Sequence, residues 1–113
     1  MTMKNLTKKI INELKGHKVI ALLSNSNLPS LSDSDYWQEE LLLTKAGKYI
    51  LYAEGGANTQ YRDESGNPGW TERSKGYKYC RMTQEEAEKW LEESKQQSIE
   101  NDYFVFEKFE KED

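Results

Sequence analysis

Cysteine and histidine are almost absent from this chain. Its 113 residues include one cysteine, Cys80, and one histidine, His17. A lone cysteine cannot form an internal disulfide, and one thiol with one imidazole cannot supply the four ligands of a structural zinc site. No acidic segment has the ligand spacing of a calcium loop. We therefore expect no disulfide, metal or cofactor, with Cys80 a small core residue and His17 a surface residue.

Long apolar runs are absent as well. No run approaches the roughly 18 residues that a membrane-spanning helix needs, and residues 1–9 lack the hydrophobic stretch of a signal peptide. Hydrophobic residues make up 35% of the sequence and aromatic residues 12%, against about 45–50% apolar residues in a typical domain. The composition predicts one cytoplasmic domain over residues 1–113, without a membrane partner, whose thin aliphatic core is reinforced by aromatic rings.

Negative charge is concentrated in the last third of the sequence. The formal net charge is −4. Residues 1–50 have a balance of +2 and residues 51–82 of +1, whereas residues 83–113 hold 11 acidic and 4 basic side chains, a balance of −7. Such a segment either keeps a small protein soluble as a solvated helix face, or imitates the phosphates of a nucleic acid and occupies a basic groove of another protein.

The N-terminal third predicts a helix and a strand. Apolar residues recur at helical spacing over about 4–15, and Gly16 is typical of the position after a helix. The members of this apolar stripe are Leu6, Ile10, Ile11 and Leu14. The apolar run at 19–23 favours a buried strand, although it is also compatible with continued helix.

Three further segments show strand-like alternation. Residues 36–44 and 48–54 are joined by a short turn that ends in Gly47, which predicts a hairpin. Residues 76–82 predict another strand, and the glycine-rich segment 55–69 between them predicts a long loop, a feature that is commonly functional.

The C-terminal third predicts a capped helix and an aromatic tail. Thr83 and Glu86 have the spacing of a capping box, which predicts a helix over about 84–97 that Trp90 anchors on the sheet. The acidic tail from about residue 102 is rich in aromatic residues and is compatible with either a last strand or a short helix. The expected fold is α+β: an antiparallel sheet of three or four strands packed with two helices.

Four sequence motifs resemble one family. They are Tyr36-Trp37-Gln38-Glu39-Glu40, Leu-Thr-Lys-x-Gly at 43–47, Tyr-x-Leu-Tyr-x-Glu-Gly-Gly-Ala at 49–57 and Thr-x-x-Glu-Ala-x-x-Trp at 83–90. The chain resembles small accessory proteins of phages, plasmids and conjugative elements of Gram-positive bacteria, over about half its length. The resemblance implies a bacterial host cell and a setting that includes inhibitors of host defence, among them anti-CRISPR proteins.

The function that these features favour is binding to another protein, without catalysis. No nucleophile, base and oxyanion donor can be assembled from recognisable motifs. The concrete hypothesis is that an acidic, nucleic-acid-mimicking surface inhibits a CRISPR effector nuclease. The expected partner-binding residues are Glu85, Glu88, Glu92, Glu93, Tyr61, Arg62 and Trp70.

The Glu54-Gly55-Gly56 corner is expected to shape the long loop. Its glycines permit positive φ and close backbone approach, and leave N–H groups available. Glu54 is placed to hold Arg62 or to accept N–H bonds from the loop. A catalytic Glu54 would need a partner acid, a nucleophile or a metal, and none stands at a recognisable spacing.

The alternative function is binding of single-stranded nucleic acid. Tyr77 and Tyr79 would stack on bases while Arg73 and Lys78 meet phosphates. The local balance of +1 over residues 51–82 weakens this hypothesis, and packing of the tyrosines in the core is a simpler explanation for their presence.

Overall fold

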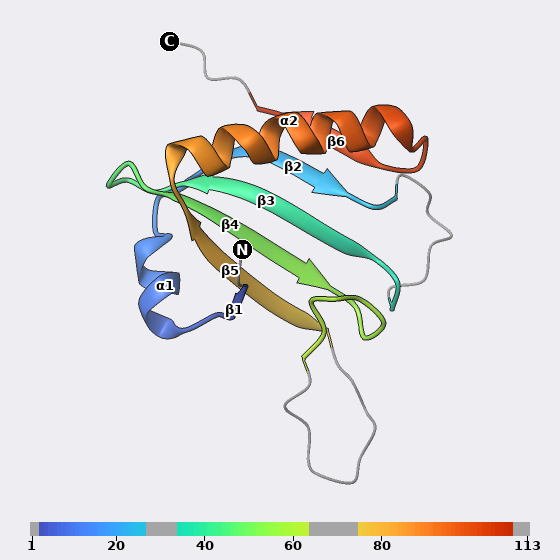
Figure 1. Cartoon of the computed structure of the whole chain (residues 1–113). Helices are drawn as coiled ribbons and strands as arrows, with labels where there is room; N and C mark the ends of the chain where they lie inside the picture. The colour runs from blue at the N-terminus through green and yellow to red at the C-terminus, as the bar shows by residue number, and fades with distance from the viewer. Residues whose placement is uncertain (1–2, 27–33, 64–74, 110–113) are drawn as a thin grey trace, which may run out of the picture.

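The computed structural model describes residues 3–26, 34–63 and 75–109. Its architecture is α+β, as predicted, and is built on one antiparallel sheet (Figure 1). Across the sheet the strand order is β1-β5-β4-β3-β2-β6. The elements in chain order are β1 (Lys4–Asn5), α1 (Lys8–Glu13), β2 (Lys18–Ser24), β3 (Trp37–Leu43), β4 (Tyr49–Gly55), β5 (Gly76–Met82), α2 (Gln84–Glu100) and β6 (Val105–Lys108).

Within the described residues the sheet has six strands, whereas the sequence predicts three or four. The additional strands, β1 and β6, are short and lie at opposite edges. Lys4 and Asn5 pair with β5, and β6 pairs with β2, so the aromatic tail supplies a strand rather than a helix. Both pairings join segments that are far apart in the sequence, and a local pattern cannot reveal them.

Helix α1 is shorter than the helix predicted over 4–15. It begins after Thr7, whose Oγ1 accepts a hydrogen bond from the backbone N–H of Ile10, because the preceding residues are held in β1. Ile10 is fully buried, but Ile11 is 52% exposed, so the predicted stripe is wrong at that residue. Gly16 follows the helix with φ of 73°, the left-handed conformation expected of a helix-terminating glycine.

The predicted hairpin is confirmed as β3 and β4. Leu43 pairs with Tyr49 across the turn, and the register continues without interruption to Trp37 opposite Gly55. Thr44 Oγ1 accepts a hydrogen bond from the Lys48 backbone N–H at 3.1 Å, and Gly47 adopts a φ of 79°. The register of this hairpin decides which side chains share a face of the sheet.

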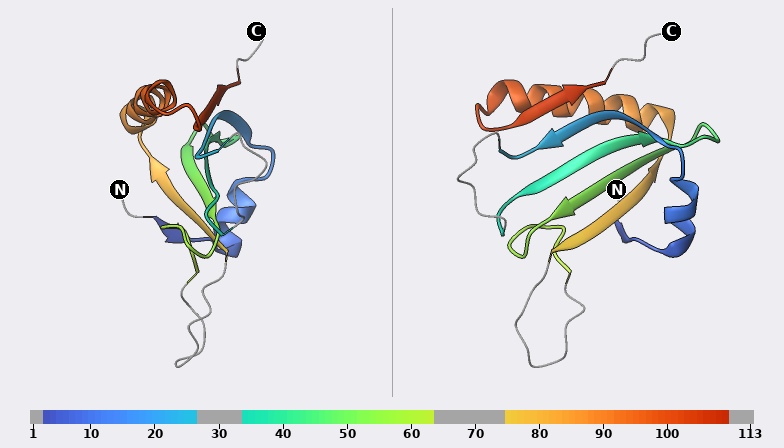
Figure 2. Two further views of the ribbon diagram at one scale, coloured as in Figure 1. Left: turned by 90° about the vertical axis from the view of Figure 1, so that its right-hand side faces the viewer. Right: turned by 180° about the vertical axis from the view of Figure 1, so that it is seen from behind.

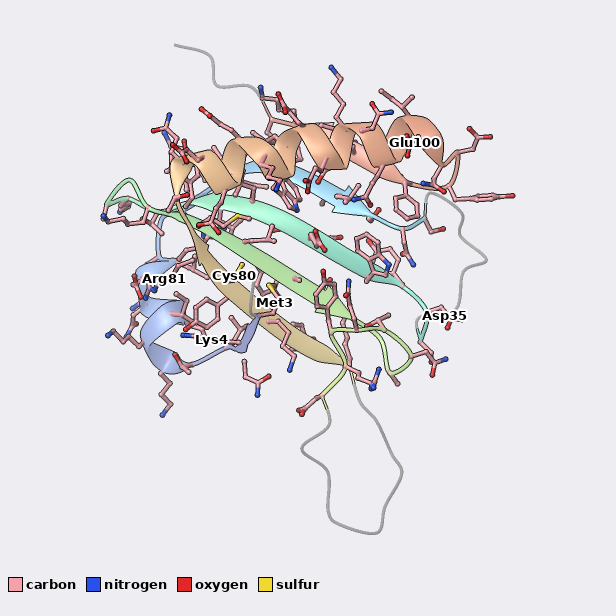
Figure 3. The ribbon with its side chains drawn as sticks, viewed as in Figure 1. Met3, Lys4, Asp35, Cys80, Arg81 and Glu100 are labelled. Carbon is pink, nitrogen blue, oxygen red and sulfur yellow. The ribbon has the colours of Figure 1, made fainter. Side chains whose placement is uncertain are left out.

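The two helices lie on opposite faces of the sheet (Figure 2). We call these the α2 face and the α1 face. Residue alternation on β5 illustrates the division, because Cys80 lies with Met3 on the α2 face and Arg81 lies beside α1 (Figure 3). The buried core under α2 consists of Ala21, Leu23, Leu41, Leu51, Cys80, Met82, Ala87 and Trp90.

Helix α2 begins with the predicted capping box. Thr83 Oγ1 accepts a hydrogen bond from the Glu86 N–H at 3.1 Å, and the Glu86 carboxylate accepts one from the Thr83 N–H at 2.9 Å. Hydrogen bonds from the backbone and the side chain of Thr83 to the Glu86 carboxylate lower the pKa of Glu86. The helix runs to Glu100, three residues beyond the predicted end, and buries Ala87, Trp90 and Ser94 against the sheet.

A glycine pair lets the segment 56–63 lie against the end of the sheet. Gly55 of β4 is the cross-strand partner of Gly76 of β5. A Cβ atom on Gly76 would overlap the backbone of Tyr61 and Arg62, and one on Gly55 would overlap the Thr59 side chain. The close approach expected at Gly55 is therefore present, and its physical reason is contact with the segment that follows it.

Glu39 of β3 joins three parts of the structure. Its Oε1 accepts a hydrogen bond from Trp90 Nε1 of α2 at 2.8 Å, and its Oε2 accepts one from the hydroxyl of Tyr61. Burial, followed by the charge and hydrogen bond of Glu39, raises the pKa of Tyr61, so this hydroxyl stays protonated. One carboxylate thereby fixes both the helix and the segment 56–63 on the sheet.

Replacing Glu39 by Ala is predicted to lower the free energy of unfolding by about 1–3 kcal/mol, because the Trp90 and Tyr61 donors lose their acceptor. Urea denaturation followed by tryptophan fluorescence measures the change. The control is Glu92→Ala on the exposed side of α2, for which a change within about 0.5 kcal/mol is expected. Equal stabilities of the two variants would contradict the role assigned to Glu39.

Candidate protein-binding surfaces

Four exposed glutamates form what we call the acidic helix surface: Glu85, Glu88, Glu92 and Glu93 of α2. At 100° per residue the first three lie on one stripe, turned away from the buried Ala87 and Ser94. The axial rise separates successive members of this stripe by about 4.5 and 6 Å. The prediction that Glu85, Glu88 and Glu92 lie outside the apolar stripe of the helix is confirmed, and binding of a partner by these residues stays a prediction.

The lysines of α2 are too few to neutralise its glutamates, so the helix is strongly negative. The helix carries six glutamates and two lysines. Lys89 Nζ lies 3.9 Å from Glu93 Oε1, and both side chains are well exposed, at 75% and 60%. An ion pair of this length and exposure contributes little energy and is readily exchanged for a cation from another molecule.

A shallow hollow of about 210 Å³ lies beside the acidic helix surface. Trp90 and Met82 supply apolar lining, Glu86 and Glu93 supply carboxylates, and Lys89 supplies an ammonium group. The methylene stem of a lysine or arginine fits such apolar lining while its charged end meets a carboxylate. In the isolated chain Lys89 is that basic side chain, because it lines the hollow and pairs with Glu93.

The other predicted partner-binding residues fall in or near the long loop. Tyr61 is only 5% exposed and contacts Trp37 edge to face, with 6.4 Å between ring centroids. It is a core residue and does not face a partner, because the segment 56–63 packs on the sheet. Arg62 is half-buried and donates from Nη1 to the Thr59 carbonyl oxygen at 3.3 Å. Trp70 lies outside the described residues.

The Glu54-Gly55-Gly56 corner differs in detail from the expected one. The glycines with positive φ in the described part of the chain are Gly16 and Gly47, so the corner does not use left-handed backbone. The Gly56 N–H is not available, because it donates to the Tyr36 carbonyl oxygen at 2.9 Å. The Glu54 carboxylate accepts a hydrogen bond from the Tyr52 hydroxyl at 3.4 Å.

The pleat of β5 separates the residues of the nucleic-acid alternative. Lys78 lies on the α2 face, where its ammonium donates to Asn5 Oδ1 of β1, whereas Tyr77 and Tyr79 lie on the α1 face. Arg73 lies outside the described residues. Across the sheet, Tyr77 is opposite Glu54, and Tyr79 is opposite Tyr52, which is itself opposite Glu40. Carboxylates beside the rings repel phosphates, so this geometry disfavours stacking of nucleic acid.

The tyrosines and carboxylates of the α1 face form a group that sequence reasoning missed. We call it the tyrosine–carboxylate patch: Tyr36, Gln38, Glu40, Tyr52, Glu54, Tyr77 and Tyr79. The Tyr36 hydroxyl donates to Gln38 Oε1 at 2.8 Å, and Gln38 Nε2 donates to Glu40 Oε1 at 2.5 Å. The signal in the sequence is the alternation of β3 and β4, which becomes informative only once their register is known.

Glu40 of this patch lies in surroundings that change its pKa. Burial raises its pKa, and the nearby charge of Glu54 adds to the increase, while the hydrogen bond from Gln38 and the charge of His17 oppose it. His17 itself is exposed, as predicted, and its Nδ1 donates to the Leu14 carbonyl oxygen at 2.6 Å. Glu40 is therefore held in a setting that disfavours its ionised form.

The thiol and the potential metal ligands in the described part of the chain form no reactive site. Cys80 is a buried core residue, as predicted, and burial with the charge of Glu86 raises the pKa of its thiol to about 11. Among the described residues no three His, Cys, Asp or Glu side chains are grouped to hold a metal ion. No helix in the same ranges is long and apolar enough to cross a bilayer.

Because the pKa of Glu40 is higher in the folded chain than the usual value of 4.5, its ionisation costs stability as the pH rises through and above that value. The stability of Glu40→Gln relative to the wild type is therefore predicted to increase as the pH is raised from about 3.5 to about 7. Urea denaturation at both pH values measures the gain. Glu107→Gln, an exposed change on the same face, controls for loss of one charge. A stability difference that does not grow with pH would contradict the prediction.

Comparison with known proteins gives no match from which a function could be assigned. No protein-family model, no curated protein and no solved structure matches the chain. The resemblance to accessory proteins of mobile elements accordingly stays a prediction, and the functional conclusion is drawn from the charge and geometry of the described residues.

Proposed function

We propose that this protein acts without catalysis, by binding its acidic helix surface to a basic surface of another protein. The observation that carries the proposal is the two-sided character of α2. Its inner side is fixed to the sheet by Ala87, Trp90 and the hydrogen bond to Glu39, and its outer side presents carboxylates. Because the helix is fixed before binding, little conformational freedom is lost when the partner docks.

A line of negative charge along a fixed helix favours a partner that ordinarily binds nucleic acid. A nucleic-acid strand of a duplex carries one charge per about 3.4 Å of axis, and the acidic helix surface offers a sparser line of negative charge on a rigid rod. A groove lined with arginine and lysine attracts such a rod and is blocked by it. The concrete version of the proposal is inhibition of a CRISPR effector nuclease in the cytoplasm of a bacterial host.

The state of the other reactive groups supports binding rather than catalysis. Both carboxylate oxygens of Glu39 accept hydrogen bonds that hold the fold together. The Cys80 thiol is buried and protonated at neutral pH. These groups resemble structural elements more than a nucleophile with its base, which would need a mutual hydrogen bond and access to substrate.

Reversing four charges tests the proposal. The variant Glu85→Lys/Glu88→Lys/Glu92→Lys/Glu93→Lys is predicted to bind a target nuclease at least about tenfold more weakly, because the attraction becomes repulsion. Binding is measured by interferometry on purified CRISPR effector nucleases without nucleic acid, and inhibition by their cleavage of target DNA. Binding of the wild type should weaken steeply as salt is added.

The matched control changes charge on the same helix in the opposite direction. Lys89→Glu/Lys95→Glu makes α2 more negative and is predicted to bind at least as tightly as the wild type. Circular dichroism checks that both variants keep the helix. The proposed mechanism is wrong if charge reversal leaves binding and inhibition unchanged, and its nuclease version is wrong if the wild type binds none of the nucleases.

A further inference from the structure

The tyrosine–carboxylate patch lies on the face of the sheet opposite α2. Antiparallel pairing fixes its layout, with Glu40 opposite Tyr52 and Gln38 opposite Glu54 on β3 and β4. Helix α1 packs beside one end of this face, where Arg81 of β5 pairs with Glu13 (Figure 2). The remaining part of the face presents half-buried rings and carboxylates from three neighbouring strands.

One ring of the patch already accepts a cation from the chain itself. Lys75 Nζ lies 5.6 Å from the centroid of the Tyr77 ring, and Tyr77 is 44% exposed. The same tyrosine is the cross-strand partner of Glu54. A ring face next to a carboxylate attracts ammonium and guanidinium groups, and the Lys75 contact is an internal example of that attraction.

The charge of the patch favours further cations. Glu40 and Glu54 lie close enough for the charge of Glu54 to raise the pKa of Glu40. Glu107 extends the negative charge toward the edge of the sheet, since Leu22 is the partner of both Glu107 and Glu40. Glu40 and Glu54 are diagonal neighbours across β3 and β4, since Glu40 is opposite Tyr52 and Glu54 is opposite Gln38. Like charges at this spacing repel each other, and a cation bound between them relieves the repulsion.

Arginine is the side chain that matches this arrangement best. A guanidinium group is planar, binds carboxylates through parallel N–H donors and stacks on aromatic rings. Glu40 and Glu54 offer the acceptors, while Tyr52 and Tyr79, which are cross-strand partners, offer neighbouring rings. A lysine carries the same charge but has neither the planar donors nor the stacking surface.

We propose that the tyrosine–carboxylate patch binds an arginine-containing extended segment of a partner protein, with a guanidinium between Glu40 and Glu54 and its flat side on the rings of Tyr52 and Tyr79. This surface is separate from the acidic helix surface, because the sheet lies between them. The protein thereby has two binding faces, and this one selects arginine by shape as well as by charge.

The test uses the full ¹⁵N-labelled chain and three synthetic peptides. The probe peptide alternates glycine and arginine. In the second peptide lysine replaces arginine, and in the third citrulline replaces it, which keeps the shape but removes the charge. The arginine peptide is expected to shift the amide resonances of β3, β4 and β5, the lysine peptide to bind more weakly, and the citrulline peptide to leave the spectrum unchanged.

Substitutions on the two faces separate this inference from the proposed function. Glu40→Gln/Glu54→Gln should weaken binding of the arginine peptide at least about tenfold while keeping a dispersed spectrum. The charge-reversal variant Glu85→Lys/Glu88→Lys/Glu92→Lys/Glu93→Lys should bind the peptide with wild-type affinity. Shifts confined to α2, equal binding of the arginine and citrulline peptides, or unchanged affinity of the double variant would each overturn the inference. None of these outcomes depends on binding of a nuclease.

Discussion

The placement of α2 depends on one half-buried carboxylate. Glu39 lies on the apolar side of β3 between Trp37 and Leu41, where an unpaired charge would be costly. The indole of Trp90 and the hydroxyl of Tyr61 meet its two oxygens and make its burial tolerable. The hydrogen bonds of Glu39 to Trp90 and Tyr61 link the three elements that carry these residues. The helix, the strand and the segment 56–63 therefore form one cooperative unit.

The pleat of the sheet gives this small chain two chemically different sides. Under α2, aliphatic and aromatic side chains form a closed core. On the α1 face, the same strands present carboxylates, an amide and phenol rings linked by hydrogen bonds. The α1 face is polar only in part, because Leu42 and Ile50 are buried on it. Glu40 is half-buried on this face, and burial disfavours its ionised form.

Signals that are local in sequence predicted the structure well, whereas contacts between distant residues were missed. The capping box at Thr83 and the exposed side of α2 follow from spacing within one or two helical turns, and both were predicted. The first helix was predicted to begin too early because residues 4–5 pair with β5. Ile11 lies within α1, but on its exposed side, so the apolar stripe was drawn too wide. Tyr61 was taken for a surface residue because nothing nearby indicates its contact with Glu39, 22 positions earlier.

The two candidate surfaces show the same limit. Glu85, Glu88 and Glu92 of the acidic helix surface could be grouped from helical periodicity alone. The juxtaposition of Glu40 with Tyr52 and Tyr79 requires the register of three strands, which alternation within each strand does not specify. For the same reason Lys78 was grouped with tyrosines that the sheet places on its other face.

The position of β6 has a consequence for how the chain is made. Ser24 of β2 pairs with Val105 of β6, 81 positions later. At a synthesis rate of roughly 5–20 residues per second, β6 is made on the order of 4–16 seconds after β2. Until then the backbone N–H and C=O groups on that edge of β2 lack their partners. During that interval an apolar strand edge stays open to other nascent chains.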